Sequence, residues 1–155
     1  MGGRGGYEFF PEDGNHLFTM TQWYPRLCVY SDNQGWQNHQ FTGRGEFALT
    51  FGNFKVNMNV PSDHIVASTG SGKNFSEVLT AEQFARWQKA QNTKEPIEIV
   101  TLDEAKKAEK SKSKNRKTWT FEAENVRDFA FHFRQSLQEI SKLKISASIR
   151  AATTT

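Results

Sequence analysis

The stretch Phe54-Lys-Val-Asn-Met-Asn-Val60 decides the fold class, because its side chains alternate between apolar and polar along its whole length. Alternation with a period of two puts the apolar side chains on one face of an extended strand. Pro61 closes the stretch, since proline cannot donate to a central ladder. The preceding run Glu46–Phe51 is separated from it by Gly52-Asn53, a pair typical of a two-residue hairpin turn. We therefore predict a β-hairpin over residues 46–60.

Other segments extend this β pattern. Short apolar or alternating blocks predict strands at 17–23, 65–68, 97–100, 119–123 and 129–133, whereas residues 1–15 and 31–44 have the turn chemistry of loops. The period changes over residues 80–91, where Thr80 can cap a helix and Phe84 and Trp87 share one face. A short exposed helix is predicted over 103–110. The expected fold is mainly β: an incomplete antiparallel domain, saddle-like or sandwich-like, with one or two surface helices.

The composition is that of a polar, basic chain. Its 155 residues carry a net charge of +3, and much of the excess lies in the run Lys106–Lys117. Surfaces that bind single-stranded nucleic acid combine basic with aromatic side chains, and this run contains no aromatic residue. A solvated basic loop is favoured over an RNA-binding surface, so no nucleic-acid partner is expected. No apolar run approaches the roughly 20 residues of a membrane span, so none is expected.

The usual active-site spacings are absent from the sequence. It contains no H-E-x-x-H zinc helix, no pair of cysteines and no nucleophile elbow. Cys28 lies in an apolar segment and is interpreted as a small buried hydrophobe. The histidines are too far apart for a local metal pair; they are His16, His39, His64 and His132. We predict no catalytic residue, no metal ligand and no cofactor site in this chain.

Four passages resemble, in order, the aminopeptidase N-type (gluzincin) zinc metallopeptidases. They are Phe18–Tyr30 with its Thr21-Gln22 pair, Gly45–Pro61, Ile65–Gly70 and Trp119–Phe131. The resemblance implies that residues 1–131 are part of an N-terminal β domain that packs against a zinc-binding catalytic domain. Residues 132–155 depart from the family pattern, and we expect an atypical tail, frame-shifted or disordered.

The resemblance also implies a function. The chain would be non-catalytic, and its full-length parent would use zinc to release N-terminal residues from peptides. Its partner would be the missing downstream catalytic domain, which with it would bind a peptide substrate. In this family a Glu or Gln two residues after the Thr-Gln glutamine holds the substrate's α-amino group. Tyr24 occupies that position here, so Gln22 and Tyr24 are the expected cleft-lining residues, although a phenol brings no negative charge.

A second interpretation needs no parent enzyme. A free-standing β-sandwich can act as a binding module for carbohydrate or protein, and aromatic side chains in loops suit such a role. Tyr30 and Trp36 are the candidates. The structural alternative for Gln22 and Tyr24 is that they form a strand end buried against its neighbours.

Overall fold

Antiparallel strands dominate the structure, a computed structural model that describes residues 4–11, 15–39, 48–110 and 112–134. One sheet has the order β1-β2-β9-β6, formed by Arg4–Phe10, Asn15–Thr21, Phe131–Arg134 and Ile65–Ser68. A second has the order β5-β8-β7, formed by Gly52–Pro61, Arg116–Val126 and Ser71–Gly72. The short strands β3 (Tyr30–Ser31) and β4 (Gly35–Trp36) pair with each other. The prediction of a mainly β, antiparallel fold is confirmed.

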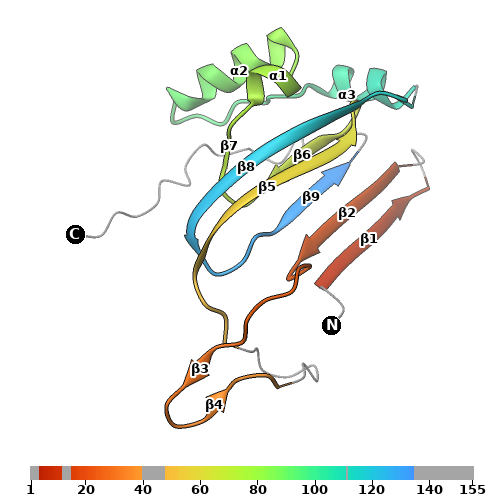
Figure 1. The fold of residues 1–155 in the computed structure, drawn as a ribbon. Helices are drawn as coiled ribbons and strands as arrows, with labels where there is room; N and C mark the ends of the chain where they lie inside the picture. Colours follow the sequence, from red (N-terminus) through yellow and green to blue (C-terminus); the bar gives the residue numbers. More distant parts are fainter. Residues whose placement is uncertain (1–3, 12–14, 40–47, 111, 135–155) are drawn as a thin grey trace.

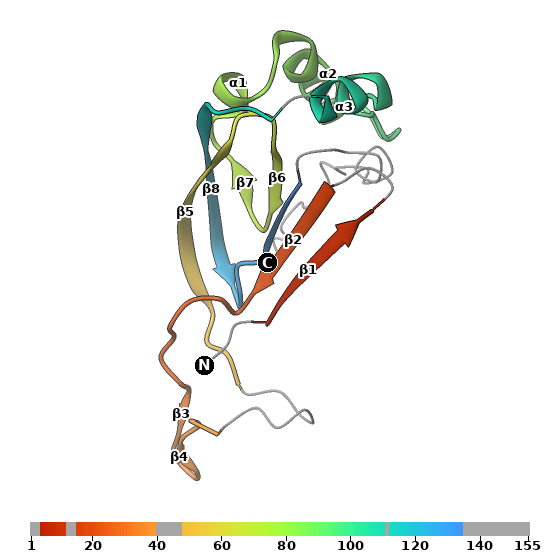
Figure 2. The same ribbon diagram turned by 90° about the vertical axis from the view of Figure 1, so that its right-hand side faces the viewer.

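The two larger sheets face each other as two layers. Figure 2 shows β5 and β8 on one side and β9, β2 and β1 on the other. The chain crosses from one layer to the other between β5 and β6, between β6 and β7, and between β8 and β9. Between them lies the hydrophobic core, whose most buried side chains are Trp119, at 1% exposure, and Phe129, at 0%. The arrangement is sandwich-like because both layers contribute apolar side chains to this one core.

The ladder between β5 and β8 is the longest in the described part of the chain. The predicted alternation from Phe54 to Val60 is confirmed, since every second side chain in β5 is exposed and those between turn inward. The predicted hairpin is wrong: Gly52 and Asn53 belong to β5, and β5 pairs with β8. A register shift follows Gly52, and the Asn53 side chain accepts a 2.9 Å hydrogen bond from the Asn125 N–H. The Gly-Asn pair therefore serves an irregular strand start, not a turn.

The helices lie together at one end of the strands (Figure 1). In the described part of the chain they are α1 (Phe75–Val78), α2 (Ala81–Gln91) and α3 (Leu102–Glu109), one more than the highest number expected. Thr80 caps α2 as predicted, in a capping box with Gln83, and Thr101 caps α3 in the same way. The strand predicted at 97–100 does not form. Its residues Ile99 and Val100 are buried in the core all the same.

The N-terminal segment departs from the prediction. Residues 1–15 were expected to be loop, but β1 occupies Arg4–Phe10 and pairs with β2 from end to end. At the other end, the predicted domain boundary between residues 131 and 132 lies inside β9, so His132 to Arg134 belong to the first sheet. The remainder of the predicted tail, 135–155, lies outside the described residues.

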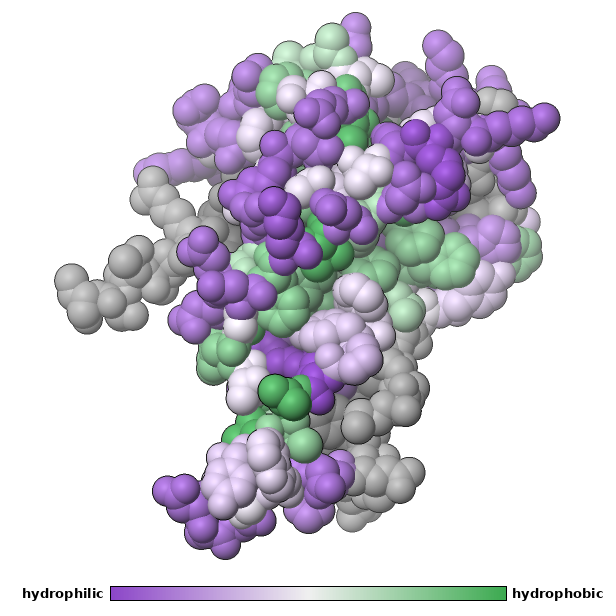
Figure 3. Space-filling view, viewed as in Figure 1, coloured by the Kyte–Doolittle hydropathy of each residue, from purple (hydrophilic) through white to green (hydrophobic). Residues whose placement is uncertain are grey.

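The arm that carries β3 and β4 projects from the opposite end to the helices (Figure 1). Its large side chains are open to solvent: Leu27 is 84% exposed, and Tyr30 and Trp36 are each 58% exposed. In Figure 3 hydrophilic residues predominate around the helices, whereas many of the more hydrophobic residues lie across the middle of this face.

The basic run Lys106–Lys117 is not one loop, since Lys106 and Lys107 lie in α3 and Lys117 lies in β8. Among the described residues, no helix is long and apolar enough to cross a membrane.

Candidate functional site

The segment that follows β2 turns sharply at Gln22. Its φ of 49° lies in the left-handed region, which residues other than glycine adopt at a cost of about 1–2 kcal/mol. The backbone N–H of Gln22 donates a 2.9 Å hydrogen bond to Oδ2 of Asp128 and so holds this conformation. Strand β2 ends here because the turn carries the chain out of the sheet. Strain of this kind gathers at functional sites, so the segment is a candidate for one.

Tyr24 comes next on the same segment and also contacts Asp128. Its hydroxyl donates a 3.0 Å hydrogen bond to Oδ1 of that carboxylate. Its ring meets Phe54 and Trp23 edge-on, with centroids 5.4 and 5.3 Å away. Burial and the hydrogen bond to Asp128 together raise the pKa of Tyr24, so the phenol stays neutral at physiological pH.

Arg26 completes the cluster. Its Nη1 lies 3.3 Å from Oδ1 of Asp128, its Nη2 donates to the Thr50 carbonyl at 2.8 Å, and its guanidinium lies over the Tyr24 ring at 5.5 Å. The side chains of Arg26 and Asp128 are 14% and 20% exposed. Trp23 adds a hydrogen bond from Nε1 to the Phe129 carbonyl, at 3.0 Å. We call Gln22, Tyr24, Arg26 and Asp128 the Asp128 cluster.

The cluster joins parts of the chain that are more than 100 positions apart in sequence. The Asp128 carboxylate accepts from the Gln22 amide, the Tyr24 hydroxyl and the Arg26 guanidinium, and its negative charge lies beside a positive one. A carboxylate with two oxygens can accept all three donors at once. The cluster therefore fixes the 21–26 segment against the connection between β8 and β9.

The two predicted site residues, Gln22 and Tyr24, are thus brought together around one carboxylate. The backbone N–H of Gln22 and the hydroxyl hydrogen of Tyr24 are both used in internal contacts. Two groups remain available to a ligand. One is the Tyr24 hydroxyl oxygen, which still has lone pairs that can accept a hydrogen bond. The other is the side-chain amide of Gln22, which makes no hydrogen bond to the described residues. Sequence reasoning missed Asp128, because nothing in its local sequence reveals a partner so far away along the chain.

A second polar cluster surrounds the turn between β5 and β6. Asp63 contacts His64 Nδ1 at 2.8 Å and accepts from the Ser113 N–H at 2.8 Å. Burial tends to raise the pKa of the Asp63 carboxyl, but these hydrogen bonds outweigh it and lower the pKa. The hydroxyls of Ser62 and Ser113 hydrogen-bond to each other at 2.6 Å, and among the described residues neither hydroxyl bonds to His64. These hydrogen bonds stabilise the turn, and they do not place a general base beside either serine as nucleophilic catalysis requires.

Lys117 is the most strongly perturbed group that the structure describes. Its Nζ donates a 3.0 Å hydrogen bond to the Val78 carbonyl and lies 5.0 Å from the centroid of the Trp119 ring. Burial lowers its pKa to about 8, against a small opposing effect of the Asp63 charge. These contacts attach α1 to β8.

The remaining candidates for chemistry stay apart. Within the described ranges, no group of three or more His, Cys, Asp or Glu side chains is placed to hold a metal ion. Cys28 is half-buried. Burial lowers the pKa of His132, which sits in the middle of a sheet and not beside another histidine.

No protein-family model, no curated protein and no solved structure matches the chain.

Proposed function

We propose that this chain is the non-catalytic N-terminal β domain of a zinc-dependent aminopeptidase, whose parent protein removes N-terminal residues from peptides. The observation that carries the proposal is the Asp128 cluster. Two of the passages that resemble this family, Phe18–Tyr30 and Trp119–Phe131, meet there through side chains and backbone. A resemblance spread over distant passages gains support when those passages form one spatial unit.

The cluster suggests how the domain would serve a substrate. The α-amino group of a peptide is an ammonium, which donates hydrogen bonds and favours negative potential. The Tyr24 oxygen can accept one such bond, and the carboxylate behind it polarises the hydroxyl toward Asp128. In the proposed role Gln22 and Tyr24 line the rim of the cleft. The zinc ion and the catalytic groups would come from the downstream domain.

The test begins with the gene. Reading all three frames beyond codon 131 should reveal a G-x-M-E-N motif and an H-E-x-x-H motif followed by a distal glutamate. The joined protein should then release the N-terminal residue from amino-acid p-nitroanilides, and a chelator should abolish the release. If no frame contains these motifs, the proposal is wrong.

A second candidate function rests on the arm. Tyr30 and Trp36 meet edge-on with centroids 5.2 Å apart, and both remain more than half exposed. Such a pair suits a free-standing module that binds carbohydrate, because sugar rings stack on exposed aromatic faces. Titration of the chain with soluble oligosaccharides should then quench tryptophan fluorescence, and the Trp36→Ala variant should lose that response. The Trp23→Ala variant is the matched control, since Trp23 lies outside the arm.

A further inference from the structure

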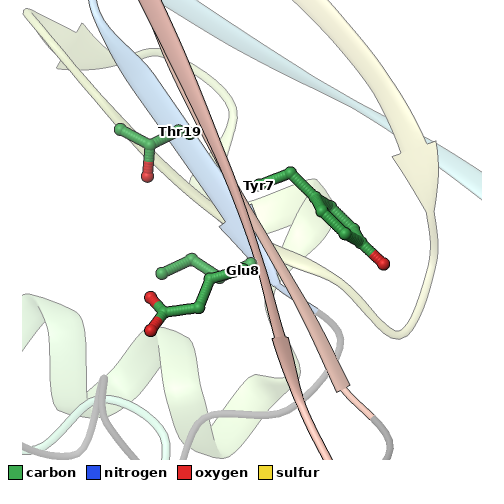
Figure 4. Close-up of a pocket in the computed structure, with 5 residues that line it drawn as sticks. Tyr7, Glu8 and Thr19 are labelled. Atoms are coloured by element: carbon green, nitrogen blue, oxygen red, sulfur yellow. The ribbon is translucent and has the colours of Figure 1, made fainter.

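An open hollow lies on one face of the first sheet and offers a ligand little enclosure. Its lining residues are Gly6, Tyr7, Glu8, Leu17 and Thr19. Figure 4 shows Glu8 and Thr19 on one face of the β1–β2 pair and Tyr7 on the other. Glu8 and Thr19 are both exposed to solvent, so a ligand in the hollow would gain no enclosed polar contact from them. The amine of Lys117, outside the Asp128 cluster, is the better candidate for chemistry.

Lys117 occupies a position on the inward face of β8. The inward row of this strand continues with Trp119, Phe121 and Ala123, all of them buried in the core. The residue opposite Lys117 in the ladder with β5 is Val60, which is also buried. Lys117 itself is half-buried. It is therefore a basic side chain at the end of an apolar row, and solvent can still reach it.

The amine of Lys117 contacts one hydrogen-bond acceptor and one aromatic face. Its Nζ donates a 3.0 Å hydrogen bond to the carbonyl oxygen of Val78, the last residue of α1, and lies 5.0 Å from the Trp119 ring centroid. An ammonium has three hydrogens to donate, whereas a secondary amide has one. Among the described residues, the charge that acts on the amine is that of Asp63, and burial outweighs its effect. The surroundings therefore suit a neutral nitrogen better than a charged one.

The same surroundings make this amine a nucleophile near neutral pH. Burial lowers the pKa of Lys117 to about 8, so about a fifth of the amine is neutral at pH about 7.4. A lysine with the ordinary pKa of about 10.4 is neutral in only about one molecule in a thousand at that pH. The lone pair of the neutral form attacks an electrophile. A less basic amine attacks more slowly, but that loss is smaller than the gain in neutral amine.

We propose that Lys117 is an acylation site, at which an acyl phosphate transfers a short neutral acyl group to the amine. The Nζ lone pair forms a bond to the acyl carbon, the bond from that carbon to the phosphate oxygen breaks, and inorganic phosphate leaves with the electron pair. The amine proton passes to water. The product amide keeps one N–H, which can still donate to the Val78 carbonyl, and the positive charge is lost. An acyl group that carries a carboxylate is disfavoured, because the carbonyl oxygen and the face of the Trp119 ring both repel an anion.

Acetyl phosphate tests the reactivity of the amine. The full chain is incubated with it at pH about 7.4, and the initial rate of acetylation at each lysine is measured by mass spectrometry. Lys117 should react about tenfold faster than the control Lys55, an exposed lysine whose Nζ lies 3.1 Å from a Glu122 oxygen. The preference should disappear in concentrated urea, because the fold creates it. Equal rates in the folded chain, or a preference that persists in urea, overturn the proposal.

Chains in which acetyllysine replaces one lysine test the product. At neutral pH acetyllysine in place of Lys117 should raise the urea midpoint of unfolding, because the cost of burying a charge is removed and the N–H to Val78 is kept. Acetyllysine in place of Lys55 is the matched control and should not raise it, since that amine is exposed and pairs with Glu122. A midpoint that stays unchanged or falls on acetylation of Lys117 overturns the proposal. Both tests concern this one amine, so they are independent of the proposed peptidase role.

Discussion

The hydroxyl of Tyr24 donates a 3.0 Å hydrogen bond to Oδ1 of Asp128, although 104 positions separate the two residues in the sequence. Asp128 also accepts hydrogen bonds from the Gln22 backbone N–H and the Arg26 guanidinium. This one carboxylate therefore holds the segment after β2 against the connection between β8 and β9. The same carboxylate therefore stabilises the fold and positions the candidate site residues, so a substitution at Asp128 tests both roles.

Replacing Asp128 by asparagine removes the charge and keeps the shape. We expect the free energy of unfolding to fall by about 1–3 kcal/mol, because hydrogen bonds to a charged group are worth more than neutral ones. Urea denaturation measures the loss. The control is Glu124→Gln, an exposed carboxylate nearby on β8, which should change the stability little. Equal effects from the two variants would show that the cluster is not holding the segment.

Tyr24→Phe deletes the hydroxyl and leaves the ring packed against Phe54. The pKa of Tyr24 is raised by burial and by the bond to Asp128, so the protonated phenol stabilises the folded state. That stabilisation is fully present below pH about 10, the pKa in the unfolded chain. It is lost as the pH rises through the higher folded pKa. Ultraviolet titration of the wild type should show a late phenolate step that the variant lacks; identical curves would contradict the assignment.

Lys117 predicts the opposite pH dependence. Its folded pKa is lowered to about 8 by burial, against about 10.4 for a free lysine. Below pH 8 the Lys117 amine is charged in both the folded and the unfolded chain, so the folded chain bears the full cost of burying that charge. Between the two values the unfolded chain binds a proton that the folded chain does not, so stability rises with pH. The difference in unfolding free energy between wild type and Lys117→Met should follow this rise from pH 7 to 10. A pH-independent difference would refute it.

Gly70 and Gly35 form a matched pair for backbone strain. Both have positive φ, at 88° and 69°. A Cβ at Gly70 would collide with the Glu122 carbonyl oxygen and lie 2.7 Å from the Ala123 Cβ, whereas at Gly35 it meets nothing within 4 Å. Gly35→Ala should cost about 1 kcal/mol for the left-handed backbone alone. Gly70→Ala should cost clearly more, in a thermal or urea unfolding comparison, because β7 must shift away from β8.

The sequence predicted those elements whose stabilising contacts are local. The alternation in β5 and the Thr80 cap of α2 depend on residues that are close in sequence, and both predictions are confirmed. The partner of β5 could not be predicted in the same way, because Gly52-Asn53 suits a hairpin equally well, and the tertiary ladder with β8 decides otherwise. Strand β1 was missed because its glycines indicate loop, while its pairing with β2 outweighs that preference.

The candidate site divides in the same manner. Gln22 and Tyr24 were predicted from the resemblance of one local passage to the aminopeptidase N-type family, and both contact Asp128 in the structure. Asp128, which organises them, is separated from them by nearly the whole described chain. Its role follows from the crossing of β8 into β9, a feature of the topology that no short motif encodes.

The ladder between β5 and β8 joins two strands that lie far apart in the sequence. It joins Pro61 to Arg116, so it closes a loop that contains all three helices of the described chain. Helices α2 and α3 carry their own capping boxes and can form within about a microsecond, whereas a long loop must first lose its chain entropy. Until that closure the apolar face of β5 stands uncovered. We therefore expect this closure to be the slow step of folding and the stage at which a newly made chain is most prone to aggregate.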